Sequence, residues 1–208
     1  ATFLSVLTAI RRGEMEEDML EHLTARRIDV YDEDTDATKL YTHNIDVDRI
    51  NLEELSKLHT KPHTFSMRHQ GSSALVEGLK RGCLSPEELE LKEGAKVLFT
   101  KNNFEAGHVN GTLGVIDSFD KDSGYPIVMT KAGEKITAVP MDWTVEDGGK
   151  VLAKISQVPL RLAWAITVHK SQGMSMDEAV IDLSRAFEYG QGYVALSRVR
   201  TLAGIVLL

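Results

Sequence analysis

The sequence predicts an α/β domain that is interrupted by an all-β insertion. Toward both ends of the chain, apolar residues recur at helical spacing or gather in short runs typical of buried parallel strands. Over residues 91–155 the pattern changes to short β-rich runs separated by turn signals such as Asn110-Gly111. Strands this short and this regularly spaced are typical of a small barrel or a curled sheet.

Helices and strands are expected on both sides of the insertion. Helices are expected over 3–10, 19–23, 47–58 and 190–199, and strands over 39–42, 63–69, 179–183 and 204–208. Gly13 is expected to end the first helix, and Asn44 or Asp46 can cap the third. Residues 85–88 read Ser-Pro-Glu-Glu, a capping box with proline at the first helical position, so a short helix is expected to begin there.

The insertion is expected to contain five strands. Their β-rich runs cover 96–100, 113–119, 126–130, 135–139 and 151–155. Turns rich in Asn, Asp and Gly separate them, because these residues adopt the backbone conformations that tight turns require.

Composition excludes several classes of protein but indicates no particular partner. No apolar run approaches the ~20 residues needed to span a bilayer, and the first 12 residues lack the layout of a signal peptide. The single cysteine, Cys83, cannot form an internal disulfide, which favours a reducing compartment. The net charge of −7 is unlike that of many nucleic-acid binders, although residues 150–208 carry seven Lys or Arg against four acids.

A polar segment lies directly after an apolar element at 162–175. Its hydrogen-bonding residues are Thr167, His169, Lys170, Ser171 and Gln172, and Gly173 follows them. Such groups on a tight turn supply donors for an oxyanion or a phosphate. A polar loop that caps a helix has the same composition, so this segment alone leaves both interpretations open.

A second segment, 190–200, reads Gly-Gln-Gly-Tyr-Val-Ala-Leu-Ser-Arg-Val-Arg. On a helix, Tyr193 and Leu196 share one face while Arg198 lies on an adjoining one. An arginine near a helix end is commonly a solvated cation that complements the helix dipole. Arg198 therefore has both a structural and a functional interpretation.

Together, the two segments resemble motifs V and VI of superfamily 1 helicases. The forms His-Lys-Ser-Gln-Gly and Gly-Gln-x-Tyr-Val-Ala-Leu-Ser-Arg resemble those of the Pif (petite integration frequency) family of DNA helicases, which is related to RecD. Residues 3–13 are similar to the family's motif IV region, with Arg11 on its arginine. Residues 91–114 are similar to its SH3-like insertion. The resemblance covers nearly the whole chain and is weakest over 14–37 and 70–90.

The resemblance implies a domain organisation. Residues 1–37 are expected to hold the end of the first RecA-like domain and linker helices. Residues 38–90 and 156–208 are expected to form the second RecA-like motor domain, of the P-loop-NTPase type with a parallel sheet and flanking helices. Residues 91–155 are expected to form an SH3-like small β-barrel inserted into it.

The resemblance also implies roles in ATP hydrolysis. In such motors ATP lies between two RecA-like domains, and Arg198 matches the motif VI arginine that reaches the γ-phosphate. An arginine suits this role because its planar fork stays charged and can bind two phosphoryl oxygens. Arg11 is expected to help at the same phosphates, and Gln172 and Gly173 are expected to meet the nucleotide cleft.

Contacts to single-stranded DNA are implied at three places. One group follows the first motor strand (Thr42, His43 and Asn44), and a second lies in motif V (Thr167, His169 and Ser171). A third group lies in the insertion (Lys101, Asn102 and Asn110). Mostly neutral donors bind phosphate without reading base sequence, as a motor that translocates over any sequence requires.

The chain contains no Walker A motif. No window supplies Gly-x-x-x-x-Gly-Lys-Ser/Thr, so the chain is expected neither to bind nor to hydrolyse ATP alone. Because it opens at Ala1 directly into a helical pattern, it is expected to come from a longer protein. In that full-length enzyme ATP and Mg²⁺ are expected, with no cofactor bound to this part alone.

No metal site and no nucleophilic cysteine are expected. His59, His63 and His69 have spacing that could suggest zinc, but Pro62 breaks any helix that would bring the first two together. Cys83 has no evident base beside it and is expected to be structural.

The function expected is therefore the C-terminal motor region of an ATP-dependent 5′-to-3′ DNA helicase. Its expected partners are single-stranded and forked duplex DNA and the N-terminal RecA-like domain of the same protein, with roles in DNA repair and recombination. It is expected to be cytoplasmic in a bacterium and nuclear or mitochondrial in a eukaryote. The alternatives are a RecD- or relaxase-type helicase domain and a stand-alone SH3-like module that binds single-stranded DNA or a peptide.

Overall fold

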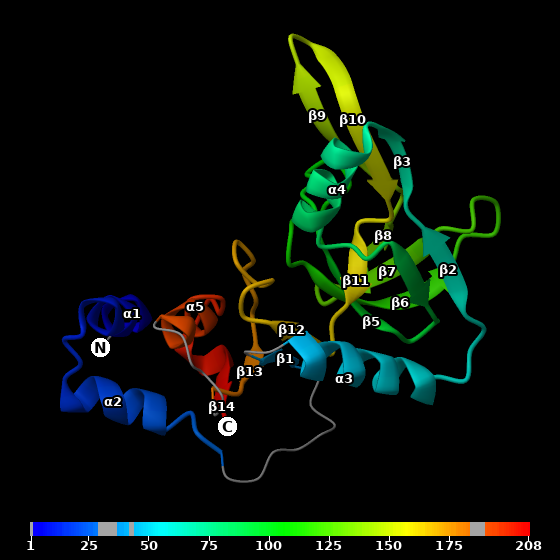
Figure 1. The fold of residues 1–208 in the computed structure, drawn as a ribbon. Helices are drawn as coiled ribbons and strands as arrows, with labels where there is room; N and C mark the ends of the chain where they lie inside the picture. The colour runs from blue at the N-terminus through cyan, green and yellow to red at the C-terminus, as the bar shows by residue number, and fades with distance from the viewer. Residues whose placement is uncertain (1, 29–36, 42–43, 184–189) are drawn as a thin grey trace. The chain divides into compact units, whose positions relative to one another are not determined.

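The computed structural model describes residues 2–28, 37–41, 44–183 and 190–208. The chain divides into two compact units, one formed by Ala1–Leu52 with Trp164–Leu208 and the other by Glu53–Ala163. The first unit contains a parallel sheet with helices, and the second contains antiparallel sheets and one helix of its own (Figure 1). An α/β domain interrupted by a β-rich segment is thereby confirmed.

The α/β unit is built on a parallel sheet with the strand order β12-β1-β13-β14. Its strands are β1 (Thr38–Tyr41), β12 (Ala165–Thr167), β13 (Ala179–Ile181) and β14 (Ile205–Leu207). In the register, Leu40 of β1 lies opposite Ile166 and Ile181, and all three side chains have 0% exposure. Such burial explains why these strands read as short apolar runs without alternation.

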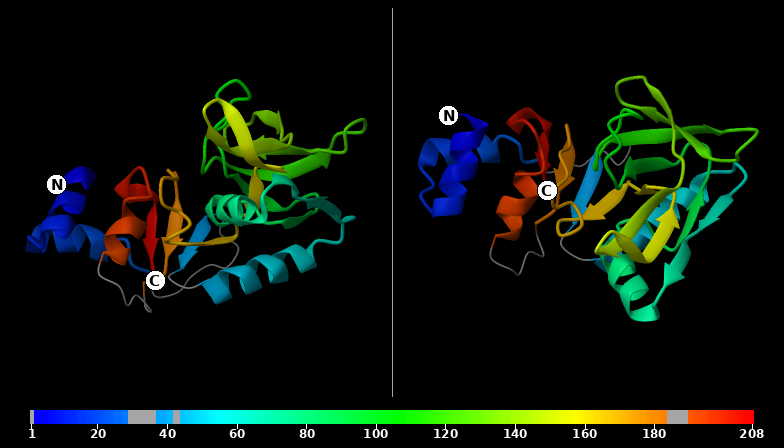
Figure 2. Two further views of the ribbon diagram at one scale, coloured as in Figure 1. Left: turned by 45° about the horizontal axis from the view of Figure 1, so that its top comes forward. Right: turned by 90° about the horizontal axis from the view of Figure 1, so that it is seen from above.

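Four helices of the described chain belong wholly or partly to this unit. They are α1 (Phe3–Arg12), α2 (Glu17–Thr24), the start of α3 (Asn44–Lys57) and α5 (Gln191–Leu196). The helices expected over 3–10, 19–23 and 47–58 are confirmed, with Gly13 as the C-cap of α1. Within the unit, α1 lies beside α5 (Figures 1 and 2).

The segment after α2 is tied to the edge of the parallel sheet. The Arg26 guanidinium donates from Nε to the Ile205 carbonyl at 2.8 Å and from Nη2 to the Ala203 carbonyl at 2.6 Å. Arg27 also forms a parallel bridge to Leu207 of β14. These bonds explain why the N-terminal helices fall into the same compact unit as the sheet, although a border after residue 37 was expected.

The second unit contains only antiparallel strand pairs among its described strands. A five-stranded sheet has the order β11-β5-β6-β7-β8, with bounds β5 (Lys96–Phe99), β6 (Leu113–Phe119), β7 (Pro126–Thr130), β8 (Lys135–Thr137) and β11 (Leu160–Leu162). A three-stranded sheet and a strand pair complete it, with β2 (His63–Ser66), β3 (Arg68–Gly71), β4 (Glu88–Leu91), β9 (Met141–Asp147) and β10 (Lys150–Gln157). Each of the five β-rich runs expected in the insertion forms a strand, and β9 is an additional strand that was not expected. Closure of the insertion into an SH3-like barrel stays a prediction.

Helix α4 (Ser73–Gly82) covers the three-stranded sheet β3-β10-β9. Val76 of α4 packs with Ala153 and Ile155 of β10, and all three are almost fully buried. Residues 73–82 were not expected to form a helix. Their apolar stripe is narrow, and it is buried only because the helix packs against this sheet.

The helix expected from residue 85 is wrong. Ser85 is buried and its hydroxyl pairs with that of Thr100 at 2.6 Å, so it does not cap a helix. Strand β4 follows, with Leu89 and Leu91 buried in alternation. Period-two burial outweighs the local capping signal, because the two leucines reach the core only in an extended chain.

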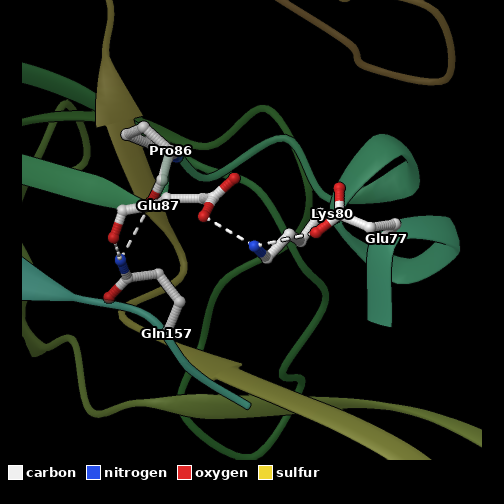
Figure 3. Close-up of polar contacts among 5 residues, drawn as sticks. All are labelled: Glu77, Lys80, Pro86, Glu87 and Gln157. Atoms are coloured by element: carbon white, nitrogen blue, oxygen red, sulfur yellow. Dashed lines mark hydrogen bonds and ion pairs between the residues drawn. The ribbon is translucent and has the colours of Figure 1, made fainter. Parts of the chain in front are cut away.

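The loop before β4 is held by polar side chains (Figure 3). The amide nitrogen of buried Gln157 donates to the carbonyls of Phe65, Pro86 and Glu87 at 3.0, 2.8 and 3.1 Å. Lys80 on α4 pairs with the carboxylates of Glu77 and Glu87 at 3.1 and 2.8 Å, which raises the pKa of its ammonium group. These contacts fix an extended loop where local sequence alone favours a helical turn.

Candidate nucleotide and nucleic-acid site

The polar segment after β12 forms a compact turn at the carboxyl end of the parallel sheet. The Ser171 backbone N–H donates to the Thr167 carbonyl at 3.0 Å, and its hydroxyl donates to the Val168 carbonyl at 2.7 Å. The Lys170 N–H donates to the Thr167 hydroxyl at 3.3 Å. These two hydroxyls stabilise the turn from inside, since Thr167 and Ser171 are 2% and 0% exposed.

Three other residues of this turn reach the surface. His169, Gln172 and Gly173 are exposed. Gly173 has φ of 76° and nothing lies within 4 Å of the position that a Cβ would take. A glycine in this left-handed conformation lets a ligand approach the backbone closely. The turn therefore combines a rigid buried interior with an open polar rim.

Strands β1 and β12 end side by side next to this turn. Tyr41 pairs with Thr167, and the Tyr41 carbonyl accepts the Val168 N–H at 2.8 Å. Ligands of open parallel sheets bind at this carboxyl edge. The expected DNA-binding residues Thr42 and His43 lie outside the described residues, and Asn44 begins α3.

The two sequence segments meet through backbone bonds. Met176 forms a parallel bridge to Val199. Its N–H donates to the Arg198 carbonyl at 2.8 Å, and its carbonyl accepts the Arg200 N–H at 2.9 Å. The turn at 167–173 and the arginine segment are therefore joined into one structure, a link that side-chain spacing in the sequence does not reveal.

Gly204 makes that link possible by its small size. A Cβ at this position would lie 1.9 Å from the Asp177 carbonyl oxygen and 3.0 Å from a Val199 methyl carbon. Only glycine lets the chain after Arg200 pass this close to the segment that follows Met176. The short 3₁₀ turn Leu202–Gly204 then leads directly into β14.

Helix α5 is shorter than expected, and Arg198 lies just beyond its end. The helix spans Gln191–Leu196, whereas 190–199 was expected. Arg198 is half-buried, and its Nε and Nη2 donate to the Val194 carbonyl at 2.9 Å and to the Ser197 hydroxyl at 2.8 Å. The side chain therefore folds back onto the last turn of its own helix.

The remaining candidate in this unit is Arg11. It is exposed in the last turn of α1, the helix that lies beside α5. Among the described residues, the Arg11 side chain makes no hydrogen bond or ion pair, whereas backbone bonds join motif V to motif VI.

The candidates in the second unit are largely engaged with other residues of that unit. The Lys101 ammonium lies 4.6 Å from the centre of the Trp143 ring and donates to the Asp142 carbonyl. The Asn102 side-chain oxygen accepts the Asn110 N–H at 2.7 Å. Among the described residues, the buried side-chain oxygen of Asn110 has no hydrogen-bond partner.

Sequence reasoning missed an exposed aromatic side chain in this loop. Phe104 is 79% exposed between Asn103 and His108, which bridge each other. His108 is buried and stacks on Phe99 with ring centres 3.9 Å apart, and its burial lowers its pKa. An exposed aromatic ring suits stacking on a nucleobase, whereas the side-chain oxygen of Asn102 is used within the loop.

Cys83 and the histidines give no sign of separate chemistry. Burial raises the pKa of the Cys83 thiol, which keeps it protonated and poorly nucleophilic. In the part of the chain that the structure describes, no cluster of three or more His, Cys, Asp or Glu could hold a metal ion. No helix in this part is long and apolar enough to cross a membrane.

The fold and the site define a parallel α/β domain with a polar turn at its carboxyl edge and an arginine segment that is linked to this turn through Met176. The chain also contains an antiparallel β unit. No family model matches the chain. It is 40% identical over 227 residues to ATP-dependent DNA helicase Pif1 of Psychrobacter sp., covering 85% of this chain and 34% of that protein. It is 38% identical to ATP-dependent DNA helicase PIF1 of Homo sapiens, covering 100% of this chain and 33% of that protein.

The solved structures that are similar to this chain are also Pif1 helicases. Pif1 from Bacteroides sp. in complex with ADP-AlF4 superposes with a TM-score of 0.85 at 29% identity, covering 99% of this chain and 48% of that one. Bacteroides Pif1 bound to single-stranded DNA gives a TM-score of 0.64 at 29% identity over 99% of this chain and 48% of that one. The chain belongs to the Pif1 helicase family, and it spans between a third and a half of the curated relatives that it matches.

Proposed function

We propose that the chain is the second RecA-like motor domain, with its SH3-like insertion, of an ATP-dependent 5′-to-3′ DNA helicase. The observation that carries this proposal is the backbone link between the polar turn at 167–173 and Arg198, made through Met176. It joins a surface suited to a nucleic-acid backbone with a cation suited to a phosphate. A displacement of the turn by DNA would therefore shift the backbone of Arg198, and the reverse.

Nucleotide binding is proposed at Gln172, Gly173 and Arg198, with Arg11 as a second cation. The exposed turn and the left-handed Gly173 fit the close approach of a phosphate-bearing ligand. The Bacteroides relative that holds ADP-AlF4 supports a nucleotide at this fold. The P-loop and the Mg²⁺ ligands would come from the partner domain, because this sequence contains no Walker A motif.

Single-stranded DNA is proposed to lie along the carboxyl edge of the parallel sheet. His169 is an exposed member of the turn, while the buried Thr167 and Ser171 form hydrogen bonds inside it. Thr42, His43 and Asn44 are proposed as neighbouring contacts, and Lys101, Asn102 and Asn110 as contacts of the insertion. Relatives solved with single-stranded DNA and at forked double-stranded DNA support this class of substrate.

The test is Arg198→Ala in the complete motor, in which this chain is joined to a P-loop domain. DNA-stimulated ATP hydrolysis should fall by about 10³-fold, because an arginine that meets the transferring phosphoryl group has effects of that size. Affinity for single-stranded DNA should stay near the parent value. Arg198→Lys should restore little, because a point charge cannot bind two oxygens as a planar fork does.

Arg200→Ala provides a matched control. Arg200 lies two residues away and carries the same charge, but its side chain is 58% exposed and pairs with Asp177 at 2.9 Å. Its loss should change hydrolysis little, since exposed ion pairs contribute little. Near-parental hydrolysis in Arg198→Ala would show that Arg198 is only a helix-end cation, and the proposal would fail. The chain alone should show no ATP turnover.

His169→Ala should give the opposite pattern. Because His169 lies on the exposed rim of the turn, its loss should first weaken single-stranded DNA binding. ATP hydrolysis per bound DNA should be retained while unwinding falls. Equal losses in binding and in unstimulated hydrolysis would contradict its assignment to the DNA.

A further inference from the structure

Three hydrogen bonds fix the arginine at the end of α5. The Ser197 hydroxyl donates to the Val194 carbonyl at 2.9 Å. Its oxygen accepts Arg198 Nη2 at 2.8 Å, and Arg198 Nε donates to the same Val194 carbonyl at 2.9 Å. The serine proton is thus committed to the backbone, which leaves the serine oxygen as an acceptor directed at the guanidinium.

These bonds use only one edge of the guanidinium. Nε and one hydrogen of Nη2 form the side edge, and both bind the helix end. The adjacent end edge consists of one hydrogen of Nη1 and the second hydrogen of Nη2, two parallel donors that match two oxygens of a phosphate. Among the described residues, none accepts a hydrogen bond from Nη1 of Arg198. The edge left open is the one suited to a bidentate contact.

An arginine that reaches a phosphate must give up the freedom of its long side chain. Ordering such a chain costs conformational entropy, and a pre-ordered chain has lost this freedom before the ligand arrives. Nε alone could turn about its single bond to the Val194 carbonyl. The second bond, to Ser197, fixes the plane of the fork, so the plane depends on the serine hydroxyl.

We propose that Ser197 is a positioning residue that holds the guanidinium of Arg198 with its two-nitrogen edge open for a phosphate of ATP. This inference rests on the proposed function, because it assigns Ser197 a role only through Arg198. The alternative is a purely structural bond, in which arginine and serine satisfy the last carbonyls of a short helix. In the positioning role, loss of the Ser197 hydroxyl lowers ATP hydrolysis only while Arg198 is present. In the structural role, its effect is the same with and without Arg198.

The experiment is a double-mutant cycle in the complete motor at saturating single-stranded DNA, with Ser197→Ala, Arg198→Ala and the double variant. Ser197→Ala should lower kcat about tenfold, equivalent to ~1.4 kcal/mol. The KM for ATP and the affinity for DNA should change little, because the loss concerns orientation of the fork. In the Arg198→Ala background, removing the serine hydroxyl should have no further effect.

Two further variants separate positioning from folding. Ser197→Thr keeps the hydroxyl and should recover most of the rate lost in Ser197→Ala. Thr24→Ala, also in the first unit, removes a hydroxyl that donates to the Leu20 carbonyl at 2.9 Å but has no arginine partner. It should leave kcat at the parent value. Circular dichroism should show equal melting temperatures for parent and Ser197→Ala.

The outcomes distinguish the two proposals. If Arg198→Ala is inactive while Ser197→Ala hydrolyses ATP at the parent rate, the positioning role is refuted and the proposed function stands. The same holds if Ser197→Ala lowers the rate by an equal factor with and without Arg198, or if it lowers the melting temperature enough to explain the loss. If Arg198→Ala keeps the parent rate, both proposals fail.

Discussion

Gln157 offers a direct test of what holds the β-rich unit together. It is 2% exposed, and its amide nitrogen donates to the carbonyls of Pro86 and Glu87 (Figure 3). The same nitrogen donates to the Phe65 carbonyl, and the side-chain oxygen accepts the Val158 N–H at 2.8 Å. Gln157→Glu keeps the shape of the side chain and removes both donated hydrogens. At neutral pH it would place a carboxylate among carbonyl oxygens that can only accept.

The cost follows from the bonds that are lost. Two buried donor hydrogens disappear, and leaving a buried acceptor unpaired costs about 1–3 kcal/mol each, with more for a charged neighbour. We therefore expect Gln157→Glu to lower the free energy of unfolding of this unit by roughly 3–5 kcal/mol at pH 7. That is a large part of the ~5–15 kcal/mol that stabilises a typical domain.

The loss should depend on pH in a definite direction. Burial and the carbonyl oxygens favour the neutral acid, so the pKa of the new carboxyl is raised in the folded state above its unfolded value of about 4.3. The folded state then binds more protons, and stability relative to the parent recovers as pH falls from 7 toward about 4.5. The protonated acid also regains one donor for a carbonyl.

Urea unfolding followed by tryptophan fluorescence measures this effect. One tryptophan lies in each unit, so a Trp164→Phe background makes Trp143 the reporter of the β-rich unit. Gln70→Glu on β3 is the matched control, because Gln70 is exposed and its change should stay within about 0.5 kcal/mol. Equal unfolding midpoints for Gln157→Glu and its parent at pH 7 would refute the reasoning.

Two further predictions concern Gly204 and His108. Gly204→Ala should destabilise the α/β unit by more than ~3 kcal/mol in thermal unfolding, because its Cβ would lie 1.9 Å from the Asp177 carbonyl oxygen. Gly78→Ala, on exposed helix surface with nothing within 4 Å, should instead stabilise its own unit by about 0.5–1 kcal/mol. Burial lowers the pKa of His108, so its contribution to stability is full above its unfolded pKa of about 6.5 and is lost as pH falls toward the folded value. Unfolding midpoints at pH 7.5 and 5.5 should therefore differ more in the parent than in His108→Phe, and equal differences would contradict this.

The residues proposed to contact DNA differ between the two units in how exposed they are. In the α/β unit, the turn residue His169, which the sequence assigned to DNA, is exposed. In the β-rich unit, Lys101 is engaged with Trp143 and Asp142, and exposed Phe104 becomes the stronger candidate for a base contact. Stacking on Phe104 would require no base sequence, as expected of a translocating motor.

The sequence by itself determined the elements whose signals are local. Helix α1 has apolar residues at regular spacing and ends at Gly13, and strands β6 and β7 have the bounds that were expected. The two motifs at 162–175 and 190–200 were sufficient to indicate the family. In each case neighbouring residues carry the signal, so no distant part of the chain is needed to interpret it.

Tertiary structure decided the elements whose stability comes from distant partners. Residues 85–88 carry a strong helix-start signal, yet Gln157, about 70 positions away, binds the carbonyls of Pro86 and Glu87 and keeps the loop extended. Helix α4 is stabilised by burial of its apolar side chains against β10. Local propensities amount to fractions of a kcal/mol per residue, and buried contacts between distant residues outweigh them.

The same division holds for the site. The sequence identified Arg198 and the polar turn as candidates, but their connection through the Met176 backbone and the orientation of the guanidinium by Ser197 came only from the fold. Backbone hydrogen bonds leave no mark in the side-chain pattern, because every residue except proline carries the same donor and acceptor. Sequence therefore names the groups that carry chemistry, and the tertiary structure sets the direction in which each group can act.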